Sequence, residues 1–429
     1  MQSFPIPMLR SAALGLGLLA GQAALAAPDC GWHGAALRPV LRADAGFAWH
    51  AGAAPAPSPA PAQQQPSPLQ PSPLQSSPLQ PPLRIALWGD SLTSAPDFID
   101  AALDAAGIPG AAVQPSFIQA GVLVPGLRLP LKSACASGGW QTGYAHKENP
   151  GKGRQPSWYG KGFVSMRSNT PGDSILLDFR SPSNATRVKA LMIVFEKARP
   201  DGSLLLGVAV DGGAERLVPL SRSSATRLQI VPDAPMAAVR IRLVSGQVTV
   251  HGFAPEYAQA PRVVLDSFSV PGGMLRSWAY ADENLFGTQD DYGLVLVQYG
   301  TNEGAAPRFS PGDYLAYLRS NLGRMRKLYP HARCMLVGPP DRGVPGAAGA
   351  AALRYAHVHR QIAAAQKQAG AELGCDFWDW QAAMGGPGAA ARWAGMQPPQ
   401  MQKDQTHLTA KGYGLSGRLF GEAMLTDRH

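Results

Sequence analysis

The chain has 429 residues, enough for two or three domains, and it combines few charged residues with abundant glycine and proline. Its formal net charge of +9 is modest for this length, and the sequence has no dense run of lysine and arginine with interleaved aromatic residues. Nucleic-acid-binding proteins need such basic clusters, so composition and charge argue against a nucleic-acid partner.

The N-terminal segment, residues 1–27, has the features of a secretory signal peptide. Arg10 supplies a positive charge, Ala12–Ala20 form a short apolar centre, and Ala24–Ala26 provide a small-residue cleavage site. The apolar centre is too short for a typical membrane span, and no later segment approaches twenty uninterrupted apolar residues. We therefore expect an exported protein with no membrane span after signal cleavage; an uncleaved anchor is the alternative.

A proline-rich linker is expected over residues 51–82, after an N-terminal arm at residues 28–50 that is too short to form a domain. Within the linker, Pro66–Gln70 recurs as Pro71–Gln75 and, in variant form, as Ser76–Gln80. Segments of this composition cannot bury a core, and they form extended, semi-rigid spacers.

The four cysteines are Cys30, Cys135, Cys334 and Cys375, and an exported chain permits disulfides between them. Their wide spacing fits no zinc-binding pattern. Cys334 and Cys375 each begin a strand-like run, so they form the preferred bridge, with two buried free thiols as the alternative. A Cys30–Cys135 bridge is left open.

The stretch Arg84–Thr93 predicts a strand, a tight turn and the start of a helix. An apolar run ends in Gly89-Asp90-Ser91, and in the helical segment that follows Ser94 is the expected N-cap and Gly107 the expected end. A serine on such a turn lies beside unpaired backbone N–H groups and the positive end of a helix dipole. Ser91 is therefore a candidate nucleophile, although Gly-Asp-Ser is also ordinary turn chemistry.

Residues 112–261 show short strands separated by turn residues, and no long helical pattern interrupts them. The expected strands are Ser174–Phe179, Val188–Phe195, Leu204–Val210, Arg216–Leu220, Arg227–Val231, Ala238–Val244 and Val248–Phe253. This pattern predicts an all-β sandwich. Its glycine-rich entry carries five aromatic residues: Trp140, Tyr144, Trp158, Tyr159 and Phe163. Such rings can stack on sugar faces, or they can simply pack within loops.

Strands and helices then alternate to the end of the chain. The expected strands are Arg262–Val270, Gly293–Tyr299, Cys334–Val337 and Cys375–Trp380, and the expected helices are Asp313–Leu328, Ala348–Ala369, closed by Gly370, and Leu408–Leu425. This alternation predicts a parallel sheet covered on both faces, with Arg84–Gly89 as its first strand. Residues 83–111 and 262–429 are thus expected to form one α/β domain, into which residues 112–261 are inserted.

Sites in open α/β sheets form at the carboxyl ends of the strands, and polar residues follow several of these ends. Ser91 follows the first strand, Asn302 follows Gly293–Tyr299, and Asp404 and His407 precede the last helix. Serine acyl transfer needs an imidazole base and a carboxylate that orients it, and a pair three residues apart can supply both. The sequence therefore predicts Ser91, His407 and Asp404 as catalytic residues.

An acyl-transfer site also needs donors for the oxyanion that forms on the carbonyl oxygen. The candidates are the backbone N–H of Ser91, the backbone N–H of Gly272 and the side-chain amide of Asn302. Two neighbouring carboxylates, Asp90 and Glu303, are expected to be structural instead. This chemistry uses no metal or other cofactor.

These segments resemble the blocks of the SGNH (GDSL) hydrolase superfamily, and they occur in the family's order: Gly89-Asp90-Ser91-Leu92, Gly272, Gly300-Thr301-Asn302 and Asp404-Gln405-Thr406-His407. The resemblance covers residues 83–111 and 262–429. It implies a flavodoxin-like three-layer fold with a five-stranded parallel sheet, Ser91 as nucleophile, His407 as base, Asp404 as its partner, and Ser91, Gly272 and Asn302 as the oxyanion hole. The chain departs from the family at Pro271, where an asparagine is usual, so the assignment of Gly272 over Gly273 stays open.

The β-sandwich inserted between the first two blocks is similar to the carbohydrate-binding-module-like insertion of the peptidoglycan O-acetylesterase branch. Tyr299–Glu303 and Phe377–Gly386 also resemble that branch. The resemblance implies a periplasmic enzyme that removes acetyl groups from the muramic acid 6-hydroxyl of peptidoglycan. The alternatives are an O-acetyltransferase with the same triad, a deacetylase of another polysaccharide, and a glycan-binding protein without activity.

Overall fold

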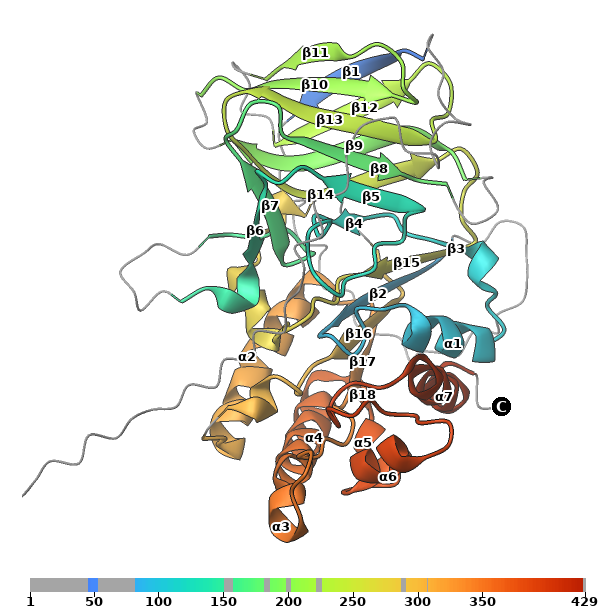
Figure 1. Ribbon diagram of the computed structural model, residues 1–429, viewed down its shortest axis with the longest axis vertical. Helices are drawn as coiled ribbons and strands as arrows, with labels where there is room; N and C mark the ends of the chain where they lie inside the picture. Colours follow the sequence, from blue (N-terminus) through green and yellow to red (C-terminus); the bar gives the residue numbers. More distant parts are fainter. Residues whose placement is uncertain are drawn as a thin grey trace, which may run out of the picture.

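The computed structural model describes residues 45–52, 82–149, 157–180, 186–197, 202–220, 226–286, 291–306 and 308–426. The expected signal peptide, Cys30, and almost all of the N-terminal arm and the proline-rich linker lie outside these residues. An α/β domain and an all-β domain are stacked on one another in the described part (Figure 1). This arrangement confirms the predicted α/β fold with an inserted β-sandwich.

The α/β domain is built on one parallel sheet. Its strands, in spatial order, are β18 (Cys375–Trp378), β17 (Arg333–Val337), β16 (Leu294–Gln298), β2 (Leu83–Gly89), β15 (Val263–Ser267) and β3 (Val113–Gln114). All five pairings are parallel. The first five strands have the flavodoxin-like order, and the sixth, β3, is a two-residue edge strand too short to be recognised in the sequence. The chain therefore leaves the sheet after Gln114, slightly later than expected.

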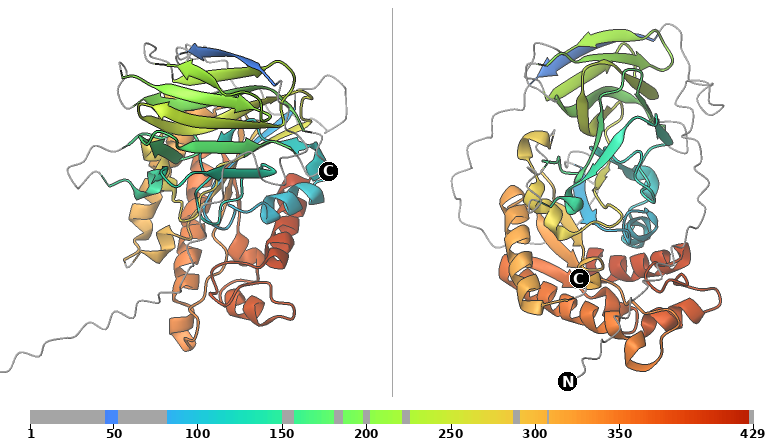
Figure 2. Two further views of the ribbon diagram at one scale, coloured as in Figure 1. Left: turned by 45° about the horizontal axis from the view of Figure 1, so that its top comes forward. Right: turned by 60° about the vertical axis from the view of Figure 1, so that its left-hand side comes forward.

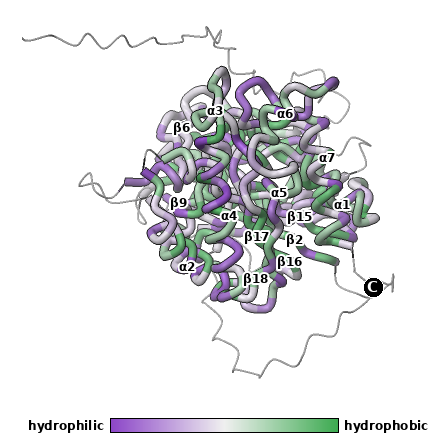
Figure 3. The backbone as a smooth tube through the Cα atoms, turned by 90° about the horizontal axis from the view of Figure 1, so that it is seen from below, coloured by the Kyte–Doolittle hydropathy of each residue, from purple (hydrophilic) through white to green (hydrophobic). Residues whose placement is uncertain are grey.

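Helices cover both faces of this sheet because the side chains of β2 alternate between two apolar cores. Ile85 and Leu87 pack on one side, with residues of α1 (Asp97–Ala105), α5 (Trp380–Ala383), α6 (Ala389–Gly395) and α7 (Ala410–Phe420). Ala86 and Trp88 pack on the other, with residues of α2 (Pro311–Leu328) and α4 (Arg354–Leu373). In Figure 3 the apolar strands lie between these two groups of helices. Burial on both faces explains the nearly continuous apolar character of the strands.

Several helix ends differ from the sequence expectation, including those of the last helix, expected over Leu408–Leu425 and found as α7 (Ala410–Phe420) followed by a π-helical turn (Gly421–Leu425). The helix expected to close at Gly370 continues to Leu373 and is capped by Gly374, whose φ of 68° is left-handed. The first helix has Pro96 at its N-cap, and the Ser94 hydroxyl instead donates to the carbonyls of Ser91 and Gly126. A short helix, α3 (Gly349–Ala352), precedes α4 and accounts for the expected start near residue 348.

The inserted domain is a sandwich of two antiparallel sheets (Figure 2). One sheet contains β1 (Phe47–Gly52), β12 (Arg227–Pro232), β9 (Val188–Lys197), β14 (Val248–Tyr257), β7 (Val164–Ser168) and β6 (Gln141–Tyr144), with β4 (Ile118–Gln119) paired to β14. The other contains β11 (Arg216–Pro219), β10 (Leu205–Val210), β13 (Ala238–Ser245), β8 (Ser174–Asp178) and β5 (Ser133–Ala136). The seven expected strands are all present, with ends that shift by a few residues.

The other strands of the sandwich come from segments that carry a weak strand pattern. β1 belongs to the N-terminal arm and pairs antiparallel with β12, and its Phe47 is buried in the sandwich core. The arm therefore completes the inserted domain rather than standing apart from it. Strand β1 also includes Ala51 and Gly52, the first two residues assigned to the linker from sequence.

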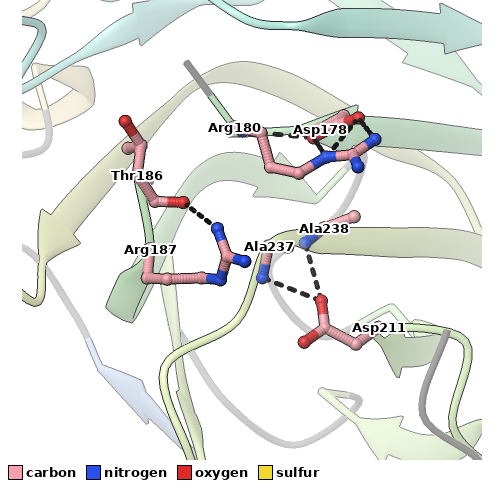
Figure 4. Close-up of polar contacts among 7 residues, drawn as sticks. All are labelled: Asp178, Arg180, Thr186, Arg187, Asp211, Ala237 and Ala238. Carbon is pink, nitrogen blue, oxygen red and sulfur yellow. Dashed lines mark hydrogen bonds and ion pairs between the residues drawn. The ribbon is translucent and has the colours of Figure 1, made fainter. Parts of the chain in front are cut away.

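A buried ion pair lies at the end of β8. The guanidinium of Arg180 contacts the carboxylate of Asp178 at 2.6 Å, and the two side chains are 5% and 0% exposed. Asp211, on a neighbouring turn, accepts hydrogen bonds from the backbone N–H groups of Ala237 and Ala238, each at 2.8 Å (Figure 4). These contacts satisfy charges inside the sandwich and fix the strand ends.

Buried polar contacts join the two domains. The indole N–H of Trp88, in the central strand of the α/β domain, donates to the carbonyl of Lys161 at 2.8 Å. Asp266, at the end of β15, accepts from the N–H groups of Ser116 and Phe117 at 2.7 and 2.8 Å. The side-chain amide of Gln119 donates to the carbonyl of Ser269 at 3.1 Å. The inserted domain is therefore fastened to β2, to β15 and to the loop that follows β15.

A disulfide joins Cys334 in β17 to Cys375 in β18, which confirms the bridge preferred from the sequence. The two residues face each other in the parallel register near the amino ends of these strands. Cys135 is disulfide-bonded as well, and the partner considered for it, Cys30, lies outside the described residues. Among the described residues, no helix combines the length and apolar character that crossing a membrane would require.

Candidate active site

The turn after β2 places Ser91 at the carboxyl end of the sheet. A side chain at Gly89 would collide with the hydroxyl of Thr93, so glycine allows the Thr93 side chain to pack against the end of β2. The buried carboxylate of Asp90 accepts a hydrogen bond from the N–H of Leu92 at 2.9 Å, which closes the turn. Ser91 itself remains partly exposed, with its hydroxyl free of the turn's own hydrogen bonds.

His407 and Asp404 lie directly beside Ser91. The Ser91 Oγ is 3.0 Å from the His407 Nε2, and the His407 Nδ1 is 2.6 Å from the Asp404 Oδ2. The structure therefore brings together the three predicted catalytic side chains, which span more than 300 residues of sequence. A proton on Nδ1 would be held by the carboxylate, leaving Nε2 as an acceptor for the serine proton.

The second carboxylate oxygen of Asp404 fixes the loop that carries the histidine. It accepts from the backbone N–H groups of Thr406 and His407 at 2.9 and 3.0 Å. Burial raises the pKa of Asp404, but the hydrogen bonds from the His407 ring and from the two backbone N–H groups outweigh it, and the net pKa is lowered. Asp404 is thus held as a carboxylate, the form that can stabilise an imidazolium.

Backbone contacts hold this loop against its neighbours. The N–H of Gln402 donates to the carbonyl of His407 at 2.8 Å, and the N–H of Gly343 donates to the carbonyl of Gln405 at 3.0 Å. Gln405 has a φ of 51°, an uncommon conformation for a residue with a side chain. Such strain persists where the surroundings impose it, and here the imposed turn lies between the two members of the Asp404–His407 pair.

The loop after β15 supplies backbone N–H groups at the same sheet edge. The N–H of Val270 donates to the carbonyl of Gly89 at 3.0 Å, which lays the loop against the Ser91 turn. The N–H of Gly273 is used within the loop, donating to the carbonyl of Val270 at 2.7 Å. Within the described residues, the N–H groups of Gly272 and Ser91 have no backbone partner. The geometry therefore favours Gly272 over Gly273 as the oxyanion donor.

Asn302 connects this loop to the end of β16. One N–H of its side-chain amide donates to the carbonyl of Gly273 at 2.9 Å, which leaves the second N–H for another acceptor. Ser91, Gly272 and Asn302 thus come from three adjacent strand ends. Together they can direct N–H groups at one point, as stabilisation of an oxyanion requires.

Glu303 has a larger structural role than the sequence indicated. Its carboxylate accepts from the N–H of Leu275 at 2.9 Å and from the N–H of Gly300 at 3.0 Å, so it joins the two loops that carry Gly272 and Asn302. Burial raises its pKa to about 7, against the lowering effect of these backbone N–H groups. The residue positions the oxyanion donors and does not itself reach the Ser91–His407 pair through any hydrogen bond of the described chain.

Asp90 is likewise enclosed. Its Oδ2 is 3.4 Å from the side-chain amide of Gln298, the last residue of β16, and burial raises its pKa to about 6. Gln298 also contacts the Thr93 hydroxyl at 3.2 Å. Sequence reasoning passed over Gln298, although a lone amide at the end of an apolar strand is a signal of such a role. Asp90 supports the turn, as expected, while Asp404 contacts the histidine.

Two features of the inserted domain were missed or only partly anticipated. His146, which no sequence argument singled out, lies against Gly272. Of the five aromatic residues considered for sugar contact, three are buried in the core and Tyr144 is partly buried, while Trp158 is 48% exposed. The packing interpretation therefore holds for Trp140, Tyr159 and Phe163.

The sequence matches a family model over part of its length. Residues 243–415 match the model of the GDSL-like lipase/acylhydrolase family. The match includes Gly272, Asn302 and the Asp404–His407 pair, but Ser91 lies before it, on the other side of the inserted domain. Folding returns Ser91 to the matched segment, because β2 pairs with both β15 and β16. No curated protein matches the chain.

Among the solved structures similar to this chain, one has a TM-score above 0.5. A peptidoglycan O-acetylesterase is 18% identical with a TM-score of 0.60, over 80% of this chain and 91% of that chain. A family 2 carbohydrate esterase with a carbohydrate-binding domain, from Corynascus thermopiles (Myceliophthora fergusii), is 14% identical with a TM-score of 0.29, over 60% and 94%. A lipase/acylhydrolase from Enterococcus faecalis is 16% identical with a TM-score of 0.26, over 38% and 75%. The first of these similarities covers more of the chain than either domain alone, so it extends the shared fold to the inserted sandwich.

Proposed function

We propose that this carboxylic-ester hydrolase removes O-acetyl groups from a cell-wall glycan. The proposal starts from the match of residues 243–415 to the GDSL-like lipase/acylhydrolase family of SGNH hydrolases. The substrate we propose is peptidoglycan acetylated on the 6-hydroxyl of muramic acid. The observation that carries the proposal is the hydrogen-bonded series Ser91, His407 and Asp404 at the carboxyl edge of the sheet.

In the first step, the Ser91 Oγ attacks the acetyl carbonyl carbon while its proton passes to the His407 Nε2. Asp404 stabilises the imidazolium, and the negative charge on the carbonyl oxygen is held by the N–H groups of Ser91, Gly272 and Asn302. The tetrahedral intermediate then collapses. The bond to the sugar oxygen breaks, and that oxygen takes the proton from His407 as the alcohol leaves.

In the second step, water attacks the acetyl group on Ser91. His407 accepts a proton from the water and returns one to the Ser91 oxygen as acetate departs, which restores the free enzyme. If a sugar hydroxyl takes the place of water, the same site transfers the acetyl group instead of hydrolysing it. The proposal favours water as the acceptor.

The choice of glycan is supported by likeness alone. A solved structure similar to 80% of this chain is that of a peptidoglycan O-acetylesterase, and the similarity spans both domains. A periplasmic location belongs to the same proposal and rests on the signal-like residues 1–27. An exported enzyme would meet the cell wall as a solid, acetylated substrate.

Acetate release tests the proposal. Purified protein is incubated with O-acetylated peptidoglycan, with acetylated xylan and with a small chromogenic acetyl ester, with and without an added sugar acceptor. We expect acetate from peptidoglycan faster than from xylan, no acetylated acceptor, and a loss of about 10,000-fold in Ser91→Ala on every substrate. Ser320→Ala, an exposed serine on α2, is the matched control. Deacetylation of xylan but not peptidoglycan would overturn the substrate assignment, and equal rates for Ser91→Ala and the wild type would overturn the serine mechanism.

A further inference from the structure

The inserted domain places one titratable side chain against the candidate oxyanion hole. His146 lies in a single 3-10 turn, η3 (Ala145–Lys147), just after β6. A Cβ atom added to Gly272 would lie 3.4 Å from the His146 Nε2 and 4.0 Å from its Cε1. The imidazole therefore packs on Gly272, whose backbone N–H has no backbone partner among the described residues.

Contacts on both sides fix this imidazole. The N–H of Ala145 donates to the carbonyl of Phe163 at 3.0 Å, which ties the turn to the inserted domain. The Tyr144 ring lies 5.4 Å from the His146 ring, and the Lys147 ammonium lies 3.9 Å above the Tyr144 ring. Tyr144 also packs on a small apolar cluster that includes Val270, at the start of the Gly272 loop. The inserted domain therefore packs directly on the loop after β15 that carries Gly272.

His146 is neutral at neutral pH, since burial, followed by the charges of Lys147 and Arg276, lowers its pKa to about 4. A neutral imidazole offers one N–H donor and one nitrogen acceptor. Within the described chain neither ring nitrogen of His146 is hydrogen-bonded. The two fully buried histidines differ, because His359 Nδ1 contacts the Pro340 carbonyl at 2.7 Å and His251 Nδ1 accepts from Gly160.

We propose that His146 is a substrate-binding residue, supplied by the inserted domain, that hydrogen-bonds the sugar unit carrying the acetyl group. An oxyanion held by the Gly272 N–H lies about 3 Å from the Gly272 backbone nitrogen. The acetylated sugar, joined to the same carbonyl carbon, then lies next to the imidazole packed on Gly272. The bond goes to a sugar hydroxyl, because a neutral imidazole can both donate to it and accept from it. This inference rests on the proposed function, and it gives the insertion a part in recognising the sugar.

The test compares two substrates in three variants: His146→Ala, His146→Gln, which keeps a neutral donor and acceptor, and His357→Ala, a control on the exposed face of α4. Steady-state kinetics are measured on O-acetylated peptidoglycan and on 4-nitrophenyl acetate, which has no sugar. We expect His146→Ala to lower kcat/KM for the glycan about 10-fold more than for the small ester, mainly through a higher KM. His146→Gln should recover most of this loss, and His357→Ala should match the wild type.

Each remaining outcome is decisive. Equal losses on both substrates in His146→Ala, with no recovery in His146→Gln, would show that the imidazole only supports Gly272, and would overturn the inference while leaving the proposed function intact. A wild type that cleaves the small ester and no acetylated glycan would overturn both. Thermal unfolding of each variant, measured in parallel, separates these outcomes from loss of folded protein.

Discussion

In the inserted sandwich, the buried charges of Asp178 and Arg180 neutralise each other at 2.6 Å. In the α/β domain, the buried carboxyl groups of Asp90 and Glu303 face backbone N–H groups and neutral side chains. Burial raises the pKa of these two groups to about 6 and about 7. Paired charges of the first kind compensate each other inside the fold, so that removing one partner is strongly destabilising, whereas enclosed carboxyls with raised pKa values gather around functional sites.

This difference separates residues that stabilise the fold from residues that organise chemistry. Asp90 and Glu303 hold the loops that carry the nucleophile and the oxyanion donors, at a cost in free energy because each is buried without a partner charge. The sandwich has no such arrangement at the Asp178–Arg180 pair, which lies at the strand ends of its own domain (Figure 4). Substitutions in the two regions should therefore change different measured quantities.

The largest expected effect is on activity in the α/β domain. His407→Ala removes the group that takes the Ser91 proton, so kcat for a chromogenic acetyl ester should fall about 10,000-fold, equivalent to about 5.5 kcal/mol in the barrier. Thermal unfolding should change little, because the His407 side chain is 37% exposed. His357→Ala provides the control. A loss of less than 10-fold in His407→Ala would remove this histidine from the mechanism.

A comparable effect on stability is expected in the sandwich. Asp178→Ala leaves the buried Arg180 without its carboxylate, which should lower the free energy of unfolding by about 3–5 kcal/mol. The matched control is Glu256→Ala, which breaks an exposed pair with Lys189 and should cost less than about 1 kcal/mol. Denaturant titration measures both. Molecules of Asp178→Ala that remain folded should keep wild-type turnover. A loss of turnover in the folded molecules as large as in the catalytic variants would contradict the distinction between the two regions.

A third prediction returns to the oxyanion donors. Asn302→Ala removes the side-chain amide, so kcat should fall about 100- to 1,000-fold, or about 2.7–4 kcal/mol, with a smaller change in KM. The control is Asn284→Ala, an exposed asparagine whose amide bonds only its neighbour Asp282 among the described residues. An unchanged kcat in Asn302→Ala would show that the amide serves only to hold the Gly273 carbonyl.

The smallest effect concerns pH and the raised pKa of Glu303. Because this pKa rises from 4.5 to about 7 on folding, the native state holds a proton that the unfolded state has lost between these values. Stability therefore falls as pH rises from 4.5 to 7, by roughly 3 kcal/mol from this group. Glu303→Gln lacks the ionisation, so its stability relative to the wild type should improve as pH rises. A difference between the two proteins that is constant over this pH range would contradict the raised pKa.

The sequence was sufficient to predict the architecture because its signals are local and repeated. The apolar strands of the parallel sheet, the turn residues of the sandwich and the alternation of helix and strand all follow from side-chain periodicity. The Cys334–Cys375 disulfide was also predicted, because two strand-like runs start with cysteine. What periodicity could not supply was β3, whose two residues carry too little pattern, and β1, which the arm contributes from beyond the linker.

For the site, sequence order was a good guide to the residues at strand ends and a poor guide to what lies around them. Ser91, Asn302 and His407 stand next to recognisable strands or turns, so their proximity follows from the sheet. His146 lies in an inserted domain, and only the docking of that domain brings it to Gly272. The roles of Gln298 and Glu303 depend on which backbone N–H groups face them, and spacing along the chain does not encode this.

The central claim is that Ser91 carries the acetyl group between substrate and water. The direct measurement is peptide mass spectrometry after rapid acid quenching of the enzyme during turnover of an acetyl ester. The account predicts one added acetyl group on the peptide that contains Ser91, present in the wild type and absent in Ser91→Ala. Turnover at the wild-type rate with no acetyl group on Ser91, or with the acetyl group on another residue, would contradict it.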